Sequence, residues 1–242
     1  MTTGAPRPTY VLDDEVAVIT LDDGKANAIG HEVLGSMNDG LDRALSDDAR
    51  AVVIAGRDGR FSAGFDLATM SSGTTAMREL VARGGRFYMR LYGYPLPTVA
   101  ACTGHALAGG AILLLALDQR VGTAAPCRIG LNEVAIGMGL PIFAVELARA
   151  RLSSTHLEPA TMAARLYDGA GAAAAGYLDR VVDPVDVIAE AMADARRLAE
   201  LRTGAYVRTK QLVRQATIDH VLATLDDDIG TLSAPAPPSP TG

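Results

Sequence analysis

The chain has 242 residues, of which 49% are hydrophobic, and a formal net charge of −6. This length allows one large domain or two small ones with a sizeable core, and the acidic balance argues against a nucleic-acid binder that works through bulk charge. The two cysteines, Cys102 and Cys127, are too few for a disulfide scaffold, and we expect inert buried thiols. Neither they nor the dispersed histidines have metal-ligand spacing, so no metal site is expected.

The start of the chain, "MTTGAPRPTY", lacks the basic and apolar stretches of a secretory signal. The longest apolar run, "ALAGGAILLLAL", has 12 residues, whereas a membrane-spanning helix takes about 20. We therefore expect a soluble cytoplasmic protein without a membrane partner.

The N-terminal half predicts alternating strands and helices. "TYVLDD" and "VAVITLDD" predict a β-hairpin, and "KANAIG" predicts a loop. Residues 31–46 place apolar side chains at helical spacing, and "AVVIAG" is typical of a buried strand. "FSAGFDLATM" predicts a glycine-containing loop that runs into a helix turn. Residues 76–93 predict a helix that ends at "YPLP", because proline disfavours its continuation.

The C-terminal half predicts mainly helices. "TVAACTGHAL" predicts a strand and a loop, "GGAILLLALD" a buried central helix, and "QRVGTA" a returning strand. Short helices are expected over 143–152 and 155–164, and longer amphipathic helices over 185–202 and 205–228. The proline-rich "SAPAPPSPTG" has no packing face, which favours a disordered or extended tail. This order predicts an α/β core of repeated strand–strand–helix units, followed by a helical segment suited to oligomerisation.

Two glycine sites are candidates for chemistry. Gly64 in "FSAGFDL" lies between a strand end and an expected helix start, and Gly109 and Gly110 open the central helix. Free backbone N–H groups at a helix start can bind an anion or a developing oxyanion, although a single glycine turn is more often structural. Ser62 is a weak candidate for a nucleophile because no nearby histidine is indicated. His105 lies beside the second glycine site.

The segment "IGLNEVAIGM" places one acidic residue, Glu133, in a mostly apolar run. It is either a helix-start carboxylate beside the helix dipole or an acid/base in a dry pocket that raises its pKa. The predicted helix over 76–93 carries several basic residues, which we interpret as a solvated face rather than an RNA-binding surface. These are Arg78, Arg83, Arg86 and Arg90.

The motifs "FSAGFDL", "TGHALAGG" and "IGLNEVAIGM" resemble the crotonase superfamily of enoyl-CoA hydratases and isomerases in their order and approximate spacing. "DDGKANAIG" resembles the early CoA-contacting loop of that family. The resemblance covers residues 8–230. It implies an α/β fold with a crotonase-like spiral of ββα units over 1–185, a helical trimerisation segment over 186–230, and a disordered or extended tail over 231–242. It also implies a homotrimer or hexamer that acts on acyl-CoA thioesters in fatty-acid metabolism, with CoA as part of the substrate and no separate cofactor.

Carried over residue by residue, the resemblance implies that the backbone N–H groups of Phe65 and Gly109 form an oxyanion hole for the thioester carbonyl. The residues that it implies for the CoA site are Lys25, Ala26, Ala63, Gly64, Asp66 and Leu67. Main-chain groups near Ala63 would meet the adenine, and Lys25 suits a phosphate as a point charge. Lys210 is expected on a solvated helix face, or else reaching a CoA in a neighbouring subunit.

The reaction depends on how many carboxylates the site holds. The resemblance implies two glutamates in hydratases, of which one matches Glu133 and the other falls at Ile112. Two positioned carboxylates serve water addition well, whereas one suits the transfer of a proton between two carbons. "IGLNE" also resembles the single-glutamate Δ3-Δ2-enoyl-CoA isomerases, so the favoured hypothesis is an isomerase with Glu133 as its proton shuttle. Two alternatives stay open: a hydratase or other lyase that uses Asp66 or His105 as the second group, and an acyl-CoA-binding protein with little turnover.

Overall fold

A six-stranded sheet forms the centre of the computed structural model, which describes residues 7–233. Its strands, in spatial order, are β1 (Thr9–Asp13), β2 (Val16–Thr20), β4 (Ala51–Ala55), β7 (Thr98–Cys102), β9 (Gln119–Thr123) and β11 (Arg180–Val182). β1 and β2 pair antiparallel, and all other neighbours pair parallel. The strands "AVVIA" and "TVAAC" are buried at every residue, as expected for parallel strands covered on both faces.

Two smaller sheets complete the strand arrangement. The second sheet contains β5 (Gly59–Ser62), β8 (Gly104–Leu107) and β10 (Ile129–Gly130), and β3 (Ala28–Ile29) pairs with β6 (Gly64–Phe65). The strand pairs β4 and β5, β7 and β8, and β9 and β10 each give one strand to the large sheet and one to the second sheet, in the same spatial order. Helices follow each pair. This is the spiral of ββα units that the sequence predicts.

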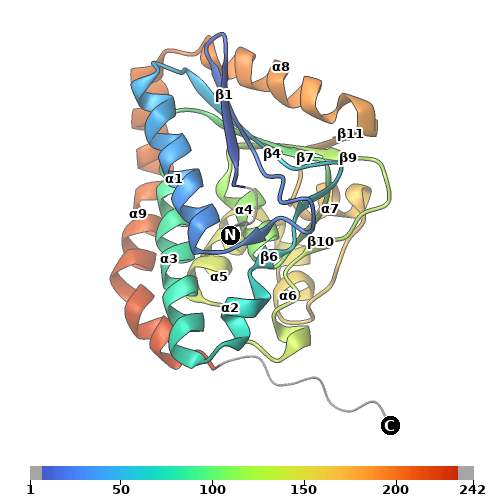
Figure 1. Cartoon of the computed structure of the whole chain (residues 1–242), viewed down its shortest axis with the longest axis vertical. Helices are drawn as coiled ribbons and strands as arrows, with labels where there is room; N and C mark the ends of the chain where they lie inside the picture. The colour runs from blue at the N-terminus through green and yellow to red at the C-terminus, as the bar shows by residue number, and fades with distance from the viewer. Residues whose placement is uncertain (1–6, 234–242) are drawn as a thin grey trace, which may run out of the picture.

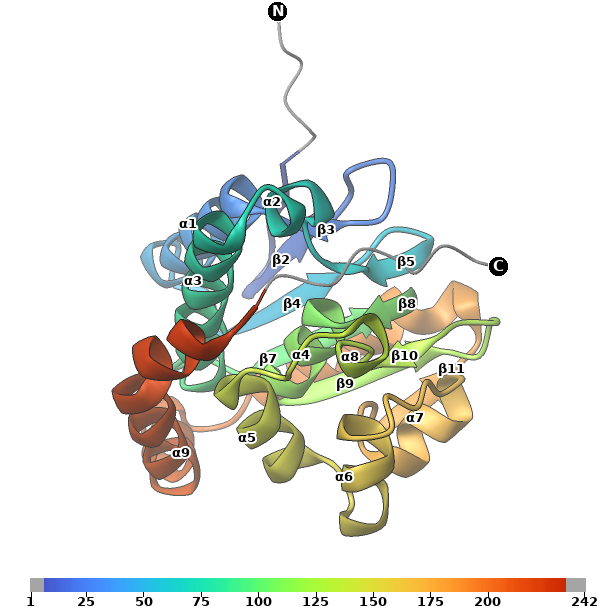
Figure 2. The same ribbon diagram turned by 90° about the horizontal axis from the view of Figure 1, so that it is seen from below.

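The helices form layers on the two faces of the large sheet. On one side α1 (His31–Ser46), α3 (Thr74–Tyr92) and α9 (Thr203–Thr231) lie side by side, while α8 (Val187–Ala199) covers the other face (Figure 1). Successive residues of a strand face opposite sides of the sheet: Ile54 faces the main core, and Val53 packs against α8. The remaining helices are α2 (Leu67–Ser71), α4 (Gly109–Ala116), α5 (Ile142–Arg151), α6 (Ser154–Thr161) and α7 (Gly169–Ala175). Seen from below, α6 and α7 lie on the opposite side of the molecule from α1 and α3 (Figure 2).

The C-terminal helix α9 is fixed to its own chain by a buried ionic cluster. The ammonium of Lys210 donates to Asp118 Oδ2 at 2.7 Å and to the carbonyl of Tyr94 at 2.8 Å, and Arg214 donates to Asp118 Oδ1 at 2.6 Å. Lys210 is only 7% exposed. The expectation of a solvated or CoA-reaching Lys210 is therefore wrong, because the buried carboxylate of Asp118 requires a cationic partner.

Most predicted elements are found, with some corrections. The helix predicted over 31–46 matches α1, whereas "GHAL" forms strand β8 rather than a loop. The helix α7 and the strand β11 were not predicted. The arginines of α3 are not simply solvated, because Arg86 pairs with Asp226 and Arg78 donates to the carbonyl of Leu232. Cys102 and Cys127 are buried and free, as predicted.

The C-terminal segment has no separate core in this structure. α8 packs on the large sheet, and α9 packs on α3 and α5. The trimer or hexamer stays a prediction, and the predicted tail falls mainly at 234–242, outside the described residues. Within 7–233, no helix is long and apolar enough to cross a membrane.

Candidate active site

The two glycine sites predicted from the sequence meet in space. Gly64 has a φ of +93°, and a Cβ on it would lie 2.9 Å from the backbone nitrogen of Gly109. A Cβ on Gly109 would in turn lie 3.3 Å from the backbone nitrogen of Phe65. Side chains at Gly64 and Gly109 would therefore crowd this junction. The structure thus brings together the two amides that the resemblance assigns to an oxyanion hole.

The start of α4 holds this junction in place. Gly109 is the first residue of α4, so its N–H has no carbonyl partner within the helix. Ala108 precedes it with φ 48° and ψ −122°, and its own N–H donates to the carbonyl of Gly130 at 3.0 Å. The hydroxyl of Ser62 donates to the carbonyl of Asn27 and accepts from the N–H of Gly64. Ser62 therefore fixes the turn, which leaves the idea of a nucleophile without support.

Glu133 lies three residues after Gly130, which ends β10 in the second sheet. Its side chain is 7% exposed, and no group in the described part of the chain donates a hydrogen bond to its Oε2. Burial raises the pKa of Glu133 to about 7, although the backbone N–H groups of Glu133 and Asn132 act in the opposite direction. This is the raised pKa expected of an acid/base in a dry pocket.

The helix-start interpretation of Glu133 fits the structure less well. Glu133 precedes the three-residue 3-10 helix η1 (Val134–Ile136), but its side chain makes no capping hydrogen bond. The apolar run around it is also divided, because Ile129 and Leu131 are buried whereas Val134 and Ile136 are exposed. The burial of the Glu133 carboxylate is therefore not explained by capping.

Tyr88 contacts the glycine junction and was not predicted from the sequence. Its hydroxyl donates to the carbonyl of Gly109 at 2.9 Å. Burial raises the pKa of Tyr88, and the negative charge of Glu133 raises it further. The sequence could have indicated that Tyr88 is buried, because it continues the helical spacing of Met77, Val81 and Gly84, all of which are buried.

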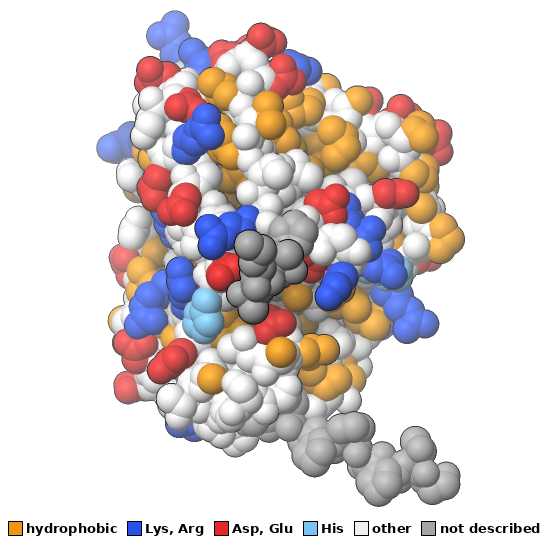
Figure 3. All heavy atoms as spheres, viewed as in Figure 1, with side chains coloured by type: hydrophobic (Ala, Val, Ile, Leu, Met, Phe, Trp, Pro, Cys, Tyr) orange, Lys and Arg blue, Asp and Glu red, His pale blue; other side chains and the backbone are white. Residues whose placement is uncertain are grey.

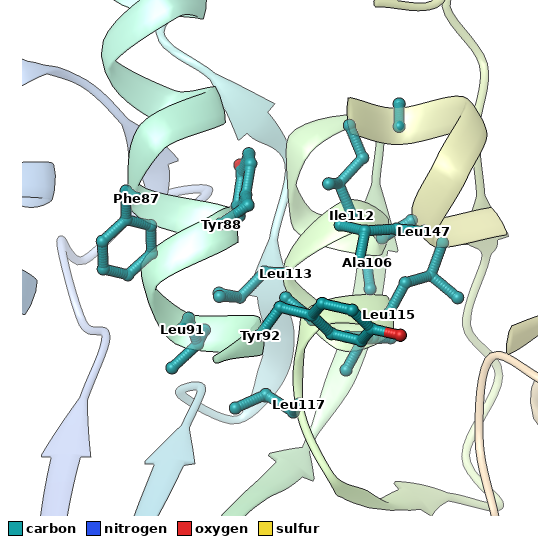
Figure 4. Close-up of a cluster of buried hydrophobic side chains, with 14 of the residues drawn as sticks. Phe87, Tyr88, Leu91, Tyr92, Ala106, Ile112, Leu113, Leu115, Leu117 and Leu147 are labelled. Atoms are coloured by element: carbon teal, nitrogen blue, oxygen red, sulfur yellow. The ribbon is translucent and has the colours of Figure 1, made fainter. Parts of the chain in front are cut away.

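The position that would carry a second glutamate is apolar. Ile112 is 0% exposed, and it lies beside Leu147 in the same buried cluster as Tyr88 (Figure 4). The two alternative second groups are already engaged. Asp66 caps α2, where its Oδ2 accepts from the backbone N–H and the hydroxyl of Thr69 at 2.8 and 2.7 Å. His105 Nδ1 accepts from the N–H of Arg128 at 3.0 Å. Among these candidate acid/base groups, Glu133 has a side chain that makes no capping hydrogen bond.

A cavity of about 470 Å³ adjoins the junction and contains half of the predicted CoA residues. Lys25, Ala26 and Asp66 line it, together with residues that were not predicted, including His31 and Thr69. Ala63, Gly64 and Leu67 do not line it, although the N–H of Ala63 donates to the carbonyl of Ala26 at 2.9 Å and so lies next to it.

The face of the molecule seen in Figure 3 has no single field of one charge. On its described residues, Lys and Arg side chains are interspersed with Asp and Glu side chains. Leu67, which the resemblance assigns to the CoA site, is 72% exposed on the surface. This mixed surface offers no support for nucleic-acid binding and agrees with recognition of a small ligand by a few local groups.

A spiral of ββα units that brings the amides of Phe65 and Gly109 together and buries one glutamate has the architecture of a crotonase-fold enzyme. The chain belongs to the enoyl-CoA hydratase/isomerase family, whose model matches residues 12–236. A putative enoyl-CoA hydratase of Thermus thermophilus is 36% identical over 82% of this chain and 80% of its own length.

Solved structures give the same relationship. An enoyl-CoA hydratase/isomerase family protein from Pseudomonas syringae is 41% identical, with a TM-score of 0.90 over 93% of this chain and 97% of its own. A Mycobacterium tuberculosis protein, named an enoyl-CoA isomerase in one solved structure and a probable enoyl-CoA hydratase in another, is 38% identical in the first, with a TM-score of 0.88 over 93% of this chain and 98% of its own. The similar proteins therefore include both named activities.

Proposed function

We propose that the protein moves the double bond of a 3-enoyl-CoA to the 2-position, with Glu133 as the single proton shuttle. The observation that carries this proposal is the combination of a buried Glu133 carboxylate, whose Oε2 accepts no hydrogen bond from the described residues, with a fully buried Ile112 at the position of the second acid. The M. tuberculosis relative carries both activity names, so the choice between isomerase and hydratase rests on these two residues.

The proposed reaction begins with the ionised carboxylate of Glu133, which takes the α-proton of the 3-enoyl thioester. The resulting dienolate places negative charge on the thioester oxygen, where the N–H groups of Phe65 and Gly109 would stabilise it. Glu133 then returns the proton to the γ-carbon, so that no proton is gained or lost overall. A carboxyl group whose pKa is about 7 suits both steps near neutral pH.

The CoA moiety is proposed to lie in the cavity lined by Lys25, Ala26 and Asp66. Its volume of about 470 Å³ falls within the range of ordinary ligand sites, roughly 300–1,000 Å³. Lys25 is exposed at its rim and is available to a phosphate. Ala63 would contribute main-chain contacts to the adenine from beside the cavity. Gly64 would contribute through the junction that it forms with Gly109.

Hydration is the second candidate, because the T. thermophilus relative is named as a putative hydratase. Besides Glu133, hydration requires a second group, so that one group activates water and the other protonates the α-carbon. The hydrogen bonds already made by Asp66 and His105 weigh against both of them. An acyl-CoA-binding protein with little turnover would give Glu133 no chemical role.

One assay separates these functions. Purified protein is offered trans-3-enoyl-CoA and trans-2-enoyl-CoA, and double-bond migration and hydration are followed for wild type and Glu133→Gln. Glu200→Gln, at an exposed position, makes the same chemical change outside the site. The proposal expects migration that collapses only in Glu133→Gln, with little hydration. Hydration faster than migration would contradict it, and binding without turnover would favour the third alternative.

A further inference from the structure

Tyr88 touches both residues whose amides form the proposed oxyanion hole. It lies on α3 and is 0% exposed. Its hydroxyl donates to the carbonyl of Gly109 at 2.9 Å, and its ring centroid lies 6.1 Å from that of Phe65 at a tilted angle of 55°. The ring also packs on Phe143, with centroids 5.6 Å apart. Tyr88 is therefore held by two aromatic neighbours while it contacts the junction.

The contact with Gly109 helps to fix the backbone on both sides of the N–H that would bind the thioester oxygen. The peptide group that carries the N–H of Gly109 lies between two others. The preceding one is fixed where the N–H of Ala108 donates to Gly130, and the following one is fixed where Tyr88 binds the carbonyl of Gly109. A Cβ on Gly109 would lie 2.9 Å from the hydroxyl oxygen of Tyr88, so this oxygen abuts the glycine directly.

The contact with Phe65 restrains the other half of the junction. The Phe65 ring lies between Tyr88 and Gly84, and a Cβ on Gly84 would lie 2.4 Å from the ring. One turn of α3 therefore receives the Phe65 side chain and supplies the Tyr88 that abuts it. Oxyanion stabilisation depends on donors placed within a few tenths of an ångström of their productive positions, and a residue that restrains both donors acts on that placement.

We propose that Tyr88 is a positioning residue that holds the Gly109 peptide and the Phe65 ring so that both N–H groups meet one thioester oxygen. The inference rests on the proposed thioester site, but not on the choice between isomerase and hydratase, because both reactions need a polarised carbonyl. The hydroxyl stays protonated throughout, since burial and the charge of Glu133 both raise the pKa of Tyr88. It acts through Gly109 and takes no part in proton transfer.

Tyr88→Phe tests the proposal because it removes the hydroxyl and keeps the ring. The chain offers a matched control in Tyr94, which is 2% exposed and donates to the carbonyl of Leu41 at 2.6 Å. Tyr94→Phe removes the same kind of buried hydrogen bond, but its acceptor belongs to α1. Both variants are expected to lose similar stability in denaturant unfolding. Only Tyr88→Phe is expected to lose kcat, by about tenfold, with KM for the enoyl-CoA within about twofold of wild type.

Two further measurements isolate the oxyanion hole. The absorption of bound cinnamoyl-CoA shifts to longer wavelength when its thioester carbonyl is polarised. Exchange of the α-protons of butyryl-CoA in D₂O needs the base and the hole but no migration or hydration. Tyr88→Phe is expected to reduce the absorption shift and to slow the exchange by about tenfold, whereas Tyr94→Phe should leave both unchanged.

The outcomes are distinguishable. The proposal is overturned if Tyr88→Phe keeps the absorption shift and the exchange rate of wild type, or if Tyr94→Phe loses them to the same extent. Should wild type exchange α-protons without migrating the double bond of a 3-enoyl-CoA, the isomerase function fails while the role of Tyr88 is still decided by the two variants. Should wild type neither polarise cinnamoyl-CoA nor exchange protons, both proposals fail.

Discussion

Replacement of Glu133 by glutamine is expected to stabilise the folded protein at alkaline pH, although the same change should abolish its chemistry. Glu133 is 7% exposed and its Oε2 has no protein donor among residues 7–233. An ionised carboxylate in such surroundings lacks the solvation that it has in the unfolded chain. Glutamine has nearly the same shape and never carries the charge, so it removes this cost.

The magnitude follows from the pKa, which burial raises from the usual 4.5 to about 7. Each pKa unit corresponds to about 1.36 kcal/mol, so a difference of about 2.5 between folded and unfolded chains corresponds to roughly 3 kcal/mol. Because the folded pKa is the higher one, the stability associated with neutral Glu133 is complete below pH 4.5. It declines as the pH rises and is lost above pH 7. The advantage of glutamine therefore grows between pH 4.5 and pH 7 and is complete above pH 7.

Urea unfolding at pH 5 and pH 8.5, at one protein concentration, measures this effect. The difference in unfolding free energy between Glu133→Gln and wild type is expected to grow by roughly 2–3 kcal/mol from the lower to the higher pH. All other titrating groups cancel in this difference. Glu200→Gln at an exposed position should show no such growth. A difference for Glu133→Gln that is the same at both pH values would refute the claim that this carboxylate is desolvated.

Three further predictions concern the site and the buried ionic cluster that fixes α9. The same pKa of about 7 predicts that kcat/KM for 3-enoyl-CoA rises about tenfold per pH unit below pH 7 and then levels, and a flat profile from pH 5 to 9 would contradict the assignment of Glu133 as base. Asp118→Asn is expected to cost about 3–5 kcal/mol in denaturant unfolding, because Lys210 and Arg214 stay buried without a counter-charge, and a loss below about 1 kcal/mol would show that the cluster is not desolvated. Ala108→Gly should raise Tm, because the φ of 48° and ψ of −122° cost a non-glycine residue roughly 1–3 kcal/mol. A lower Tm would show that Ala108 is unstrained.

The helix α1 shows what local pattern can predict. Leu34, Met37 and Leu41 recur at helical spacing, and all three are fully buried. The spacing follows from the geometry of a single helix, so it needs no knowledge of the rest of the fold. Leu45 also falls at helical spacing but is 43% exposed, whereas the adjacent Ala44 is fully buried. The pattern fixes the helix and its buried face, but not the depth of each residue.

The candidate site likewise contains some residues that were predicted from the sequence and others that were not. The resemblance to the crotonase superfamily implied that the amides of Phe65 and Gly109 would meet, and the structure brings them together. Tyr88 and Lys210 were not predicted to have these contacts, because their partners lie far away in the sequence. The acceptor of Tyr88 lies 21 residues later, and Asp118 lies 92 residues before Lys210. A single tyrosine or lysine on a helix gives no sign of such a partner.

The buried carboxylates of Asp118, in the ionic cluster that holds α9, and of Glu133 have opposite surroundings, and the contrast indicates their roles. Burial alone would raise the pKa of Asp118, but the charges of Lys210 and Arg214 and the hydrogen bond from Tyr206 hold it below its usual value. Asp118 is therefore a permanent anion that secures α9. Burial raises the pKa of Glu133 without any cation to compensate. The ionised form of Glu133 therefore carries a stability cost that packing does not explain. Such an environment suits a residue that transfers protons near neutral pH.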